Sequence, residues 1–283
     1  MSNAATSLIA RRRYCPPRGA GFPPHLSIKG GLVRALALAN QKGGVGKTTT
    51  AIHLGHGLAL AGFRVAIFDL DPQGNATLAL QESLSQAEDA PLEPLVAVGE
   101  RLWVLPSAGA DRPIAPTEQL DLDGLEGLRR RLEDEVDVLL VDCPPRMDSW
   151  GWAGLRLCNE VLVPVQAEFF AMHGLTRMMD TLELARREAG RGTELLGVFV
   201  SMFDPREQIA LDVRADLQRN LGDMLLDTVV VRDPQFIEAA SHGVSLFDYN
   251  PLAKGARCYA SLAREVLGFW SIVPRETERG VGA

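Results

Sequence analysis

The residues from Asn40 to Thr50, NQKGGVGKTTT, have the types and spacing of a loop that binds phosphate. Small residues allow successive backbone N–H groups to turn toward phosphate oxygens, and the N-terminus of a following helix adds partial positive charge. Lys47 would reach the β- and γ-phosphates, and the hydroxyl of Thr48 would bind Mg²⁺. The nucleotide contacts predicted from this pattern are Gly43, Gly44, Val45, Gly46, Lys47, Thr48 and Thr49.

The loop departs from the G-x-x-x-x-G-K-[ST] pattern at its start, where Gln41 replaces the first glycine and Lys42 adds a second lysine. Two ammonium groups so close together repel each other unless phosphate charge offsets both. A lysine that reaches across a dimer interface to the partner's nucleotide would explain Lys42, in the manner of an arginine finger that acts in trans. We therefore expect Lys42 and Lys47 to be catalytic and nucleotide to hold a homodimer together. The alternative is that Lys42 is a solvated loop residue.

Acidic residues end two later apolar runs. In RVAIFDLDPQGN, Asp69 and Asp71 lie two apart at a strand-to-loop junction, so they point the same way in an extended segment. We expect Asp71 to orient the attacking water and Asp69 to support the Mg²⁺ shell. VDVLLVDCPP ends in Asp142, in the position of a Walker B acid that holds Mg²⁺. Solvated loop acids are the alternative, which the order of the motifs behind the phosphate loop disfavours.

Short apolar runs alternate with helical patterns along the chain, and this alternation predicts an α/β fold with a doubly wound, mainly parallel sheet and helices on both faces, of the P-loop NTPase type. The expected strands are 32–39, 64–69, 102–106, 136–142, 161–166, 195–201 and 226–231. The expected helices are 49–62, 119–134, 174–190, 206–221, 234–242 and 253–268. Residues 81–100 contain prolines and acids and are predicted to be a surface connection.

The pattern predicts a single ATPase domain over residues 32–270. Residues 1–31 are rich in Pro, Gly and Arg and are expected to be a disordered extension, and residues 271–283 a flexible tail. An alternative is that the natural chain begins at Val33, because a valine codon can be a misread start site.

Charge and cysteine content restrict the partners and the compartment. The net charge of −7 argues against a surface coated with positive charge, so any contact with DNA requires a local patch, assembled across a dimer. The four cysteines form no C-x-x-C pair, which favours a reduced cytoplasmic chain over a metal cluster. The sequence contains no run of apolar residues long enough to span a membrane.

With NQKGGVGKTTT, DLDPQGNAT and VDCPP in this order, the sequence resembles ParA-type partition ATPases, the deviant Walker A branch that also contains MinD. PVQAEFFAMHGL and the segment from Val230 to Val266 add to the resemblance, which covers about residues 32–267. In the roles that it implies, Lys42 is the signature lysine in trans, Lys47 and Thr48 form the Walker A pair, Asp71 is needed for hydrolysis, and Asp142 is the Walker B acid. Arg232 falls where family members carry an arginine that binds DNA non-specifically.

The resemblance implies slow hydrolysis of ATP with Mg²⁺, a dimer that binds DNA without sequence preference, and a ParB-like or other cargo-adaptor protein that stimulates hydrolysis. Such a protein segregates or positions plasmid, chromosome or another cargo and is cytoplasmic, associated with the nucleoid. The sequence does not identify the cargo. VVVRDPQ replaces the family's more usual IPRN-like turn around Arg232, and Arg206, Arg214, Arg219, Lys254 and Arg257 are each expected to be solvated helix charges.

Two other functions remain as alternatives. A membrane-associated positioning ATPase of MinD type would need a C-terminal amphipathic helix, but Pro274 interrupts the apolar residues there. An electron-transfer relative would need bridging cysteines at a dimer face, for which Cys143 and Cys158 are the candidates. Trp150 and Trp152 stand where relatives are aliphatic and small, and they either pack on the dimer face or core or form a partner-specific surface.

Overall fold

The computed structural model describes residues 33–85, 94–107, 121–189 and 193–271. The predicted disordered extension and flexible tail therefore lie outside the described residues, apart from Ser271. Residues 119–120, the start of the helix expected at 119–134, also lie outside the described residues.

One twisted sheet of eight strands forms the centre of the described molecule, in the order β3-β4-β2-β5-β1-β6-β7-β8. All neighbouring strands are parallel except β3, which runs antiparallel to β4. The strands are β1 (Arg34–Leu38), β2 (Val65–Asp69), β3 (Val96–Gly99), β4 (Leu102–Leu105), β5 (Val138–Asp142), β6 (Glu160–Gln166), β7 (Glu194–Phe203) and β8 (Leu225–Val231). The predicted doubly wound α/β fold is confirmed, and every expected strand is present.

The predicted surface connection over residues 81–100 was wrong at both ends. A short helix occupies Gln81–Ser85, and Val96–Gly99 forms the antiparallel edge strand β3. Only four residues long, this strand pairs with β4 through an irregular register, so its alternation is too short to stand out in the sequence.

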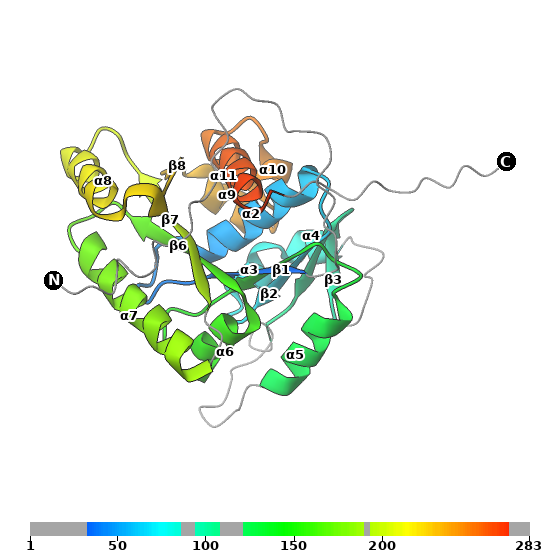
Figure 1. The fold of residues 1–283 in the computed structure, drawn as a ribbon. Coiled ribbons are helices and arrows are strands. Elements are labelled where there is room, and N and C mark those ends of the chain that lie inside the picture. The colour runs from blue at the N-terminus through cyan, green and yellow to red at the C-terminus, as the bar shows by residue number, and fades with distance from the viewer. Residues whose placement is uncertain (1–32, 86–93, 108–120, 190–192, 272–283) are drawn as a thin grey trace.

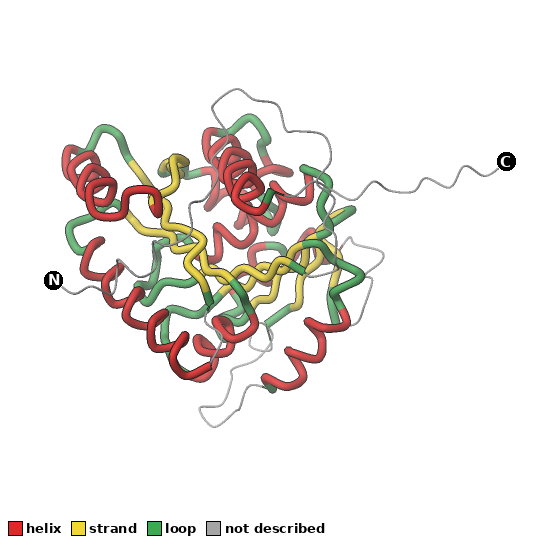
Figure 2. Tube along the Cα trace, viewed as in Figure 1, coloured by secondary structure: helices red, strands yellow, loops and turns green. Residues whose placement is uncertain are grey.

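Helices cover both faces of the sheet, as Figures 1 and 2 show. Buried residues of α5, α6, α7 and α8 join the hydrophobic core of one face, and α2 and α11 supply those of the other. The helices are α2 (Lys47–Leu60), α3 (Asn75–Ala79), α4 (Gln81–Ser85), α5 (Leu122–Arg131), α6 (Ser149–Leu157), α7 (Ala171–Ala189), α8 (Gln208–Leu221), the 3₁₀ helix η1 (Gly222–Met224), α9 (Gln235–Ser241), α10 (Leu246–Tyr249) and α11 (Lys254–Trp270). None of the described helices combines the length and hydropathy of a membrane span.

Successive residues of each central strand enter opposite cores. On β1, Ala35 and Ala37 face one core while Leu36 and Leu38 face the other, so all four are buried. Side chains of a strand alternate between faces, and a strand covered on both sides is therefore apolar at nearly every position.

The strand order places the functional motifs together. β1 lies between β5 and β6, so the chain winds away from β1 in both directions. In an open parallel sheet, the loops beyond the carboxyl ends of strands at such a reversal enclose the ligand site. The loop after β1, the acids that end β2 and β5, and the loop after β7 all lie at this edge.

Candidate functional site

The loop after β1 has the backbone of a phosphate cradle. Gly44 and Gly46 adopt left-handed conformations with φ of 74° and 88°, which residues with a Cβ rarely adopt. Gly46 is the N-cap of α2, and no side chain caps the helix there. The first N–H groups of α2 are thus left for an external acceptor, as anion binding requires. A Cβ added at Gly43 or Gly44 would meet no atom within 4 Å, so the front of the loop is open.

A cavity of about 600 Å³ opens in front of this loop. Seven residues that the sequence predicted line it: Gly43, Gly44, Gly46, Lys47, Thr48, Thr49 and Asp71. Val45 is buried behind the loop, and its carbonyl accepts a hydrogen bond of 2.8 Å from Ser201. Lys42, Asp69, Asp142 and Arg232 are not among the lining residues.

Lys47 is buried although it is cationic, with 6% of its surface exposed. Its ammonium donates a 3.1 Å hydrogen bond to the carbonyl of Lys42. Burial lowers the pKa of Lys47, and the nearby carboxyl of Asp142 opposes this shift. A buried ammonium with one neutral acceptor is well placed to gain from anionic phosphate oxygens.

Asp142 and Asp69 end neighbouring strands and are paired in register across β2 and β5. Burial raises the pKa of Asp142 to about 8, Asp69 adds to the rise, and the hydroxyl of Thr48 and the ammonium of Lys47 oppose it. Neither carboxyl oxygen of Asp142 makes a hydrogen bond of normal geometry within the described chain, and Oδ1 of Asp69 also has none. Asp69 Oδ2 accepts hydrogen bonds of 2.9 and 2.7 Å from the backbone N and hydroxyl of Thr77. Burial raises the pKa of Asp69 as well.

These oxygens fit a magnesium ion that nucleotide brings with it. Mg²⁺ prefers oxygen ligands and usually takes one or two carboxylates together with waters and substrate phosphates. Thr48 supplies a hydroxyl and Asp142 a buried carboxyl, and within the described residues neither oxygen of Asp142 nor Oδ1 of the neighbouring Asp69 makes a hydrogen bond of normal geometry. Within the part of the chain that the structure describes, no group of three or more His, Cys, Asp or Glu could hold a metal ion. The donor set therefore suits a nucleotide-bound Mg²⁺ better than a metal held by protein alone.

Asp71 lies at the cavity wall and is 8% exposed. Its Oδ1 accepts a 3.0 Å hydrogen bond from the backbone N of Gln73, and its carbonyl accepts one of 2.8 Å from Ser107. These two bonds fix the carboxyl at the wall, so the geometry suits a residue that orients water in the cavity.

The deviant start of the loop is bound to β6 and α7 rather than to the cavity. Asn40 donates a 2.8 Å hydrogen bond to the carbonyl of Pro164, and Gln41 donates one of 2.5 Å to the hydroxyl of Thr181. The ammonium of Lys42 forms an ion pair with Glu168 of the same chain. In the single chain, therefore, Lys42 is paired with Glu168 and is not among the residues that line the cavity.

Arg232 is exposed and follows β8, outside the cavity. Its backbone N donates a 3.0 Å hydrogen bond to the carbonyl of Phe203 at the end of β7. The neighbouring Asp204 binds Arg206 through both carboxylate oxygens, at 2.9 and 2.7 Å, and this pairing holds the pKa of Asp204 well below its usual range. Arg206 is solvated, as expected, since its side chain is 87% exposed, but it precedes α8 and is paired with Asp204.

Several lining residues were not predicted: Pro72, Gln73, Asn75, Pro144, Pro145, Arg146, Asp148 and Met202. Most follow directly after the acids that end β2 and β5, so their place in the sequence was the available signal. Met202 has a φ of 51°, rare for a residue with a side chain, and no pattern in the sequence marks it.

The electron-transfer alternative is disfavoured by its cysteines. Cys143 and Cys158 are both buried, and burial raises the pKa of each thiol. A bridging cluster needs accessible thiolates at a surface. Trp150 and Trp152 lie on α6 and are half-buried, and Trp152 packs against the hydrophobic core.

Comparisons with known proteins cover most of the chain. A family model for the CobQ/CobB/MinD/ParA nucleotide binding domain matches residues 36–246. The chromosome-partitioning ATPase Soj of Thermus thermophilus is 39% identical over 242 residues, which are 83% of this chain and 96% of that relative. The chromosome partitioning protein ParA of Caulobacter vibrioides is 36% identical over 254 residues, 83% of this chain and 94% of the relative. A crystal structure of cobyrinic acid a,c-diamide synthase from Mycobacterium smegmatis with bound ADP and magnesium has a TM-score of 0.67 and 27% identity, and covers 87% of this chain and 100% of that one.

Proposed function

Because this chain belongs to the CobQ/CobB/MinD/ParA family of nucleotide-binding domains, we propose that it is a ParA-type partition ATPase that positions DNA or another cargo. It is an ATPase, with ATP and Mg²⁺ as its cofactors. The observation that carries the proposal is the set of groups around one cavity: an open glycine loop, a buried lysine and an aspartate at the wall. The partitioning names of the relatives support the cellular role.

In the proposed reaction, the glycine loop and the first turn of α2 bind the phosphates, and Lys47 exchanges the carbonyl of Lys42 for phosphate oxygens. When bound, Mg²⁺ would supply positive charge that offsets the charge of the phosphates. Thr48 and Asp142 would hold the metal, Asp69 would support its shell, and Asp71 would orient the water that attacks the γ-phosphate. The buried positions of Asp69 and Asp142 keep their oxygens out of bulk water, which favours coordination over hydration.

Dimerisation is proposed to complete the site. Lys42 pairs with Glu168 in one chain, so a role in trans requires this ion pair to break when a second chain brings its nucleotide near. The exposed Arg232 of each chain would then contribute to a composite surface that contacts DNA phosphates without sequence preference. A ParB-like or other adaptor protein would stimulate hydrolysis and release the dimer.

The direct experiment measures ATP hydrolysis with and without DNA, together with DNA binding in ATP, in ADP and without nucleotide. We expect ATP-loaded protein to bind unrelated DNA sequences equally and to lose binding as salt is raised. Asp71→Ala is the control variant. It should still bind ATP while its turnover falls roughly 100-fold or more, the range expected when a positioned acid–base group is lost. Normal hydrolysis by Asp71→Ala would contradict its assigned role, and sharp sequence preference would contradict the DNA-binding proposal.

A MinD-like positioning ATPase at a membrane remains the second candidate, since the family model includes MinD. Residues 272–283, which include Pro274 and most of the segment on which that role would depend, lie outside the described residues. Sedimentation with anionic lipid vesicles distinguishes the two: ATP-dependent pelleting with vesicles and none with DNA would replace the proposal above.

A further inference from the structure

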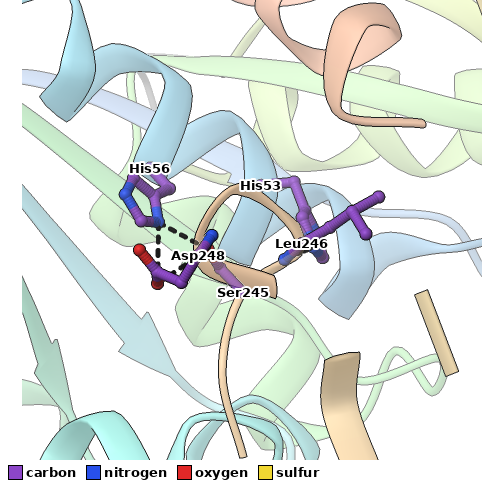
Figure 3. A network of polar contacts seen from close by, with 5 residues as sticks. All are labelled: His53, His56, Ser245, Leu246 and Asp248. Carbon is purple, nitrogen blue, oxygen red and sulfur yellow. Dashed lines mark hydrogen bonds and ion pairs between the residues drawn. The ribbon is translucent and has the colours of Figure 1, made fainter. Parts of the chain in front are cut away.

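A polar network that the proposed reaction does not use joins α2 to the C-terminal helices. Figure 3 shows His53 and His56 on α2 facing Ser245, Leu246 and Asp248. Ser245 lies 2.6 Å from Nδ1 of His56 and also donates a 3.1 Å hydrogen bond to Asp248. His56 is therefore bound to the turn that begins α10.

His53 uses both ring nitrogens within the protein. Its Nε2 accepts a 3.0 Å hydrogen bond from the backbone N of Leu246, so this nitrogen carries no proton. Nδ1 therefore bears the proton and donates a 2.7 Å hydrogen bond to the carbonyl of Thr49. Only the neutral ring with this tautomer satisfies both partners, and it connects the first turn of α2 to α10.

Tyr259 of α11 reaches the first turn of α2, where Thr50 connects it to the phosphate loop. Thr50 donates a 2.6 Å hydrogen bond from its hydroxyl to the carbonyl of Gly46, so the same oxygen accepts from the Tyr259 hydroxyl at 3.0 Å. The Tyr259 ring stacks on His53 with a centroid distance of 5.3 Å, and Phe236 of α9 contacts His53 edge-on at 4.9 Å. Tyr259 and His53 are both almost fully buried, so these bonds are poorly replaced by water.

The same C-terminal helices meet at Asp233, which directly follows Arg232. One carboxylate oxygen of Asp233 accepts from the backbone N of Gln235 at 3.1 Å, and the other from the backbone N of Gly255 at 2.9 Å. Asp233 thereby ties the starts of α9 and α11 to the residue that presents the exposed guanidinium. A continuous set of contacts thus runs from Gly46 and Thr49 through Tyr259 and His53 to Arg232.

We propose that His53 and Tyr259 are positioning residues that couple the first turn of α2, where nucleotide phosphates bind, to the Asp233 junction that presents Arg232. This inference rests on the proposed function and concerns its regulation. Phosphate binding reorders the loop around Gly46, and the buried bonds of Tyr259 and His53 pass that change to α10 and α11 because they cannot break without leaving polar groups unpaired.

Hydrogen exchange of the segment from Asp233 to Gly255, with and without Mg²⁺ and a non-hydrolysable ATP analogue, tests the coupling independently of DNA. Tyr259→Phe removes one hydroxyl and keeps the ring. His53→Gln cannot bond the backbone N of Leu246 and the carbonyl of Thr49 at the same time. Tyr249→Phe is the matched control, because within the described residues its hydroxyl bonds to Glu238, an exposed residue of α9, and not to α2. We expect the analogue to slow exchange in the wild type and the control, and this slowing to fall roughly fivefold or more in the two test variants, the lower end of usual site-to-site coupling.

The ratio of DNA affinities with and without the analogue, measured on the same proteins, separates the proposed DNA-binding function from the proposed coupling. A wild type without ATP-dependent DNA binding would overturn the proposed function, while the exchange result would still decide the coupling. Wild-type slowing of exchange retained in both Tyr259→Phe and His53→Gln would overturn the coupling, as would an absence of any nucleotide effect on this segment in the wild type. If the variants and the wild type bind the analogue with equal affinity, a smaller effect on exchange in the variants means that they bind nucleotide but do not transmit its effect to this segment.

Discussion

Two ionisable side chains at the carboxyl edge of the sheet, Asp142 and Lys47, have pKa values shifted by burial, because burial disfavours their charged forms. In the part of the chain that the structure describes, the Asp142 carboxyl makes no hydrogen bond of normal geometry, and the Lys47 ammonium donates to the neutral carbonyl of Lys42. Such groups reduce the free energy of unfolding unless a ligand supplies their partners. Their arrangement is therefore better explained by nucleotide and Mg²⁺ binding than by stability.

Asp142→Asn tests this interpretation. The amide has nearly the same shape but does not ionise, so it avoids the free-energy cost of burying the carboxylate or of protonating it on folding, and we expect the unfolding midpoint of the nucleotide-free variant to be unchanged or higher. The rise in midpoint that Mg²⁺ and ATP produce together should be strongly reduced, because the metal loses its carboxylate. Thermal unfolding with EDTA, and then with Mg²⁺ and ATP, measures both effects. A variant that is destabilised without ligand yet stabilised normally by Mg-ATP would contradict the role of Asp142.

At the scale of elements, the join between β1 and α2 depends on backbone conformations that favour glycine. Gly46 caps α2 with φ 88° and ψ 26°, and Gly43, three residues earlier, has no left-handed φ. Gly46→Ala should lower the free energy of unfolding by about 1–2 kcal/mol, the cost of a left-handed conformation for a residue with a Cβ. It should weaken ATP binding as well.

Gly43→Ala serves as the control, since an added Cβ meets open space there. Its stability should stay within about 1 kcal/mol of the wild type or rise, because alanine narrows the unfolded ensemble. Urea unfolding of both variants gives the comparison, and an equal loss in the two would mean that the left-handed conformation is not the cause.

The packing of α2 against α9, α10 and α11 also predicts a dependence of stability on pH. Burial lowers the pKa of His53 from 6.5 to about 4, and the hydrogen bond to Thr49 opposes the shift while His56 adds to it. As pH falls through 6.5, the unfolded chain binds a proton that the folded chain refuses, so the free energy of unfolding decreases until about pH 4. The contribution of His53 to this loss is roughly 3 kcal/mol.

Urea unfolding at pH 7 and at pH 5 measures the part of this loss that falls between the two values, about 2 kcal/mol. His53→Gln should show a smaller difference between the two. The other groups at this junction are His56, whose pKa burial also lowers, the carboxylate of Asp248 on α10 and the neutral hydroxyl of Tyr259 on α11. If the free energy of unfolding of His53→Gln depends on pH as in the wild type, the loss of stability at low pH is due to His56 rather than His53.

For the whole molecule, the net charge of −7 requires any DNA contact to be local. Replacing Arg232 by Ala in an ATP-bound dimer removes two cations, so the slope of log K against log salt should become shallower by about two. Arg187→Ala on α7 is the matched control. That side chain is exposed and paired with Glu183 at 3.1 Å, on a helix that covers the face of the sheet opposite α11. Equal slopes for the wild type and Arg232→Ala would remove Arg232 from the DNA surface.

Local patterns along the chain were enough to predict the α/β class and the position of the seven strands that the sequence marked. Strands covered on both faces are apolar throughout, and a glycine-rich loop between a strand and a helix is recognisable because only small residues allow its backbone. The helix Ser149–Leu157 was missed because Gly151 and Gly154 lower its helix propensity. The tertiary structure needs both glycines, because a Cβ at Gly151 would collide with the backbone of Arg146 and a Cβ at Gly154 with the sulfur of Cys143.

The sequence by itself determined which residues could bind phosphate and metal, because those chemistries require particular side chains in a particular order. Only the tertiary structure decided where each of them lies: Asp71 at the cavity wall, Asp142 beneath it, Lys42 in an ion pair with Glu168, and His53 and Tyr259 between the phosphate loop and the C-terminal helices. These arrangements join residues more than 100 positions apart. They depend on the strand order and on packing across the sheet, which no local pattern encodes.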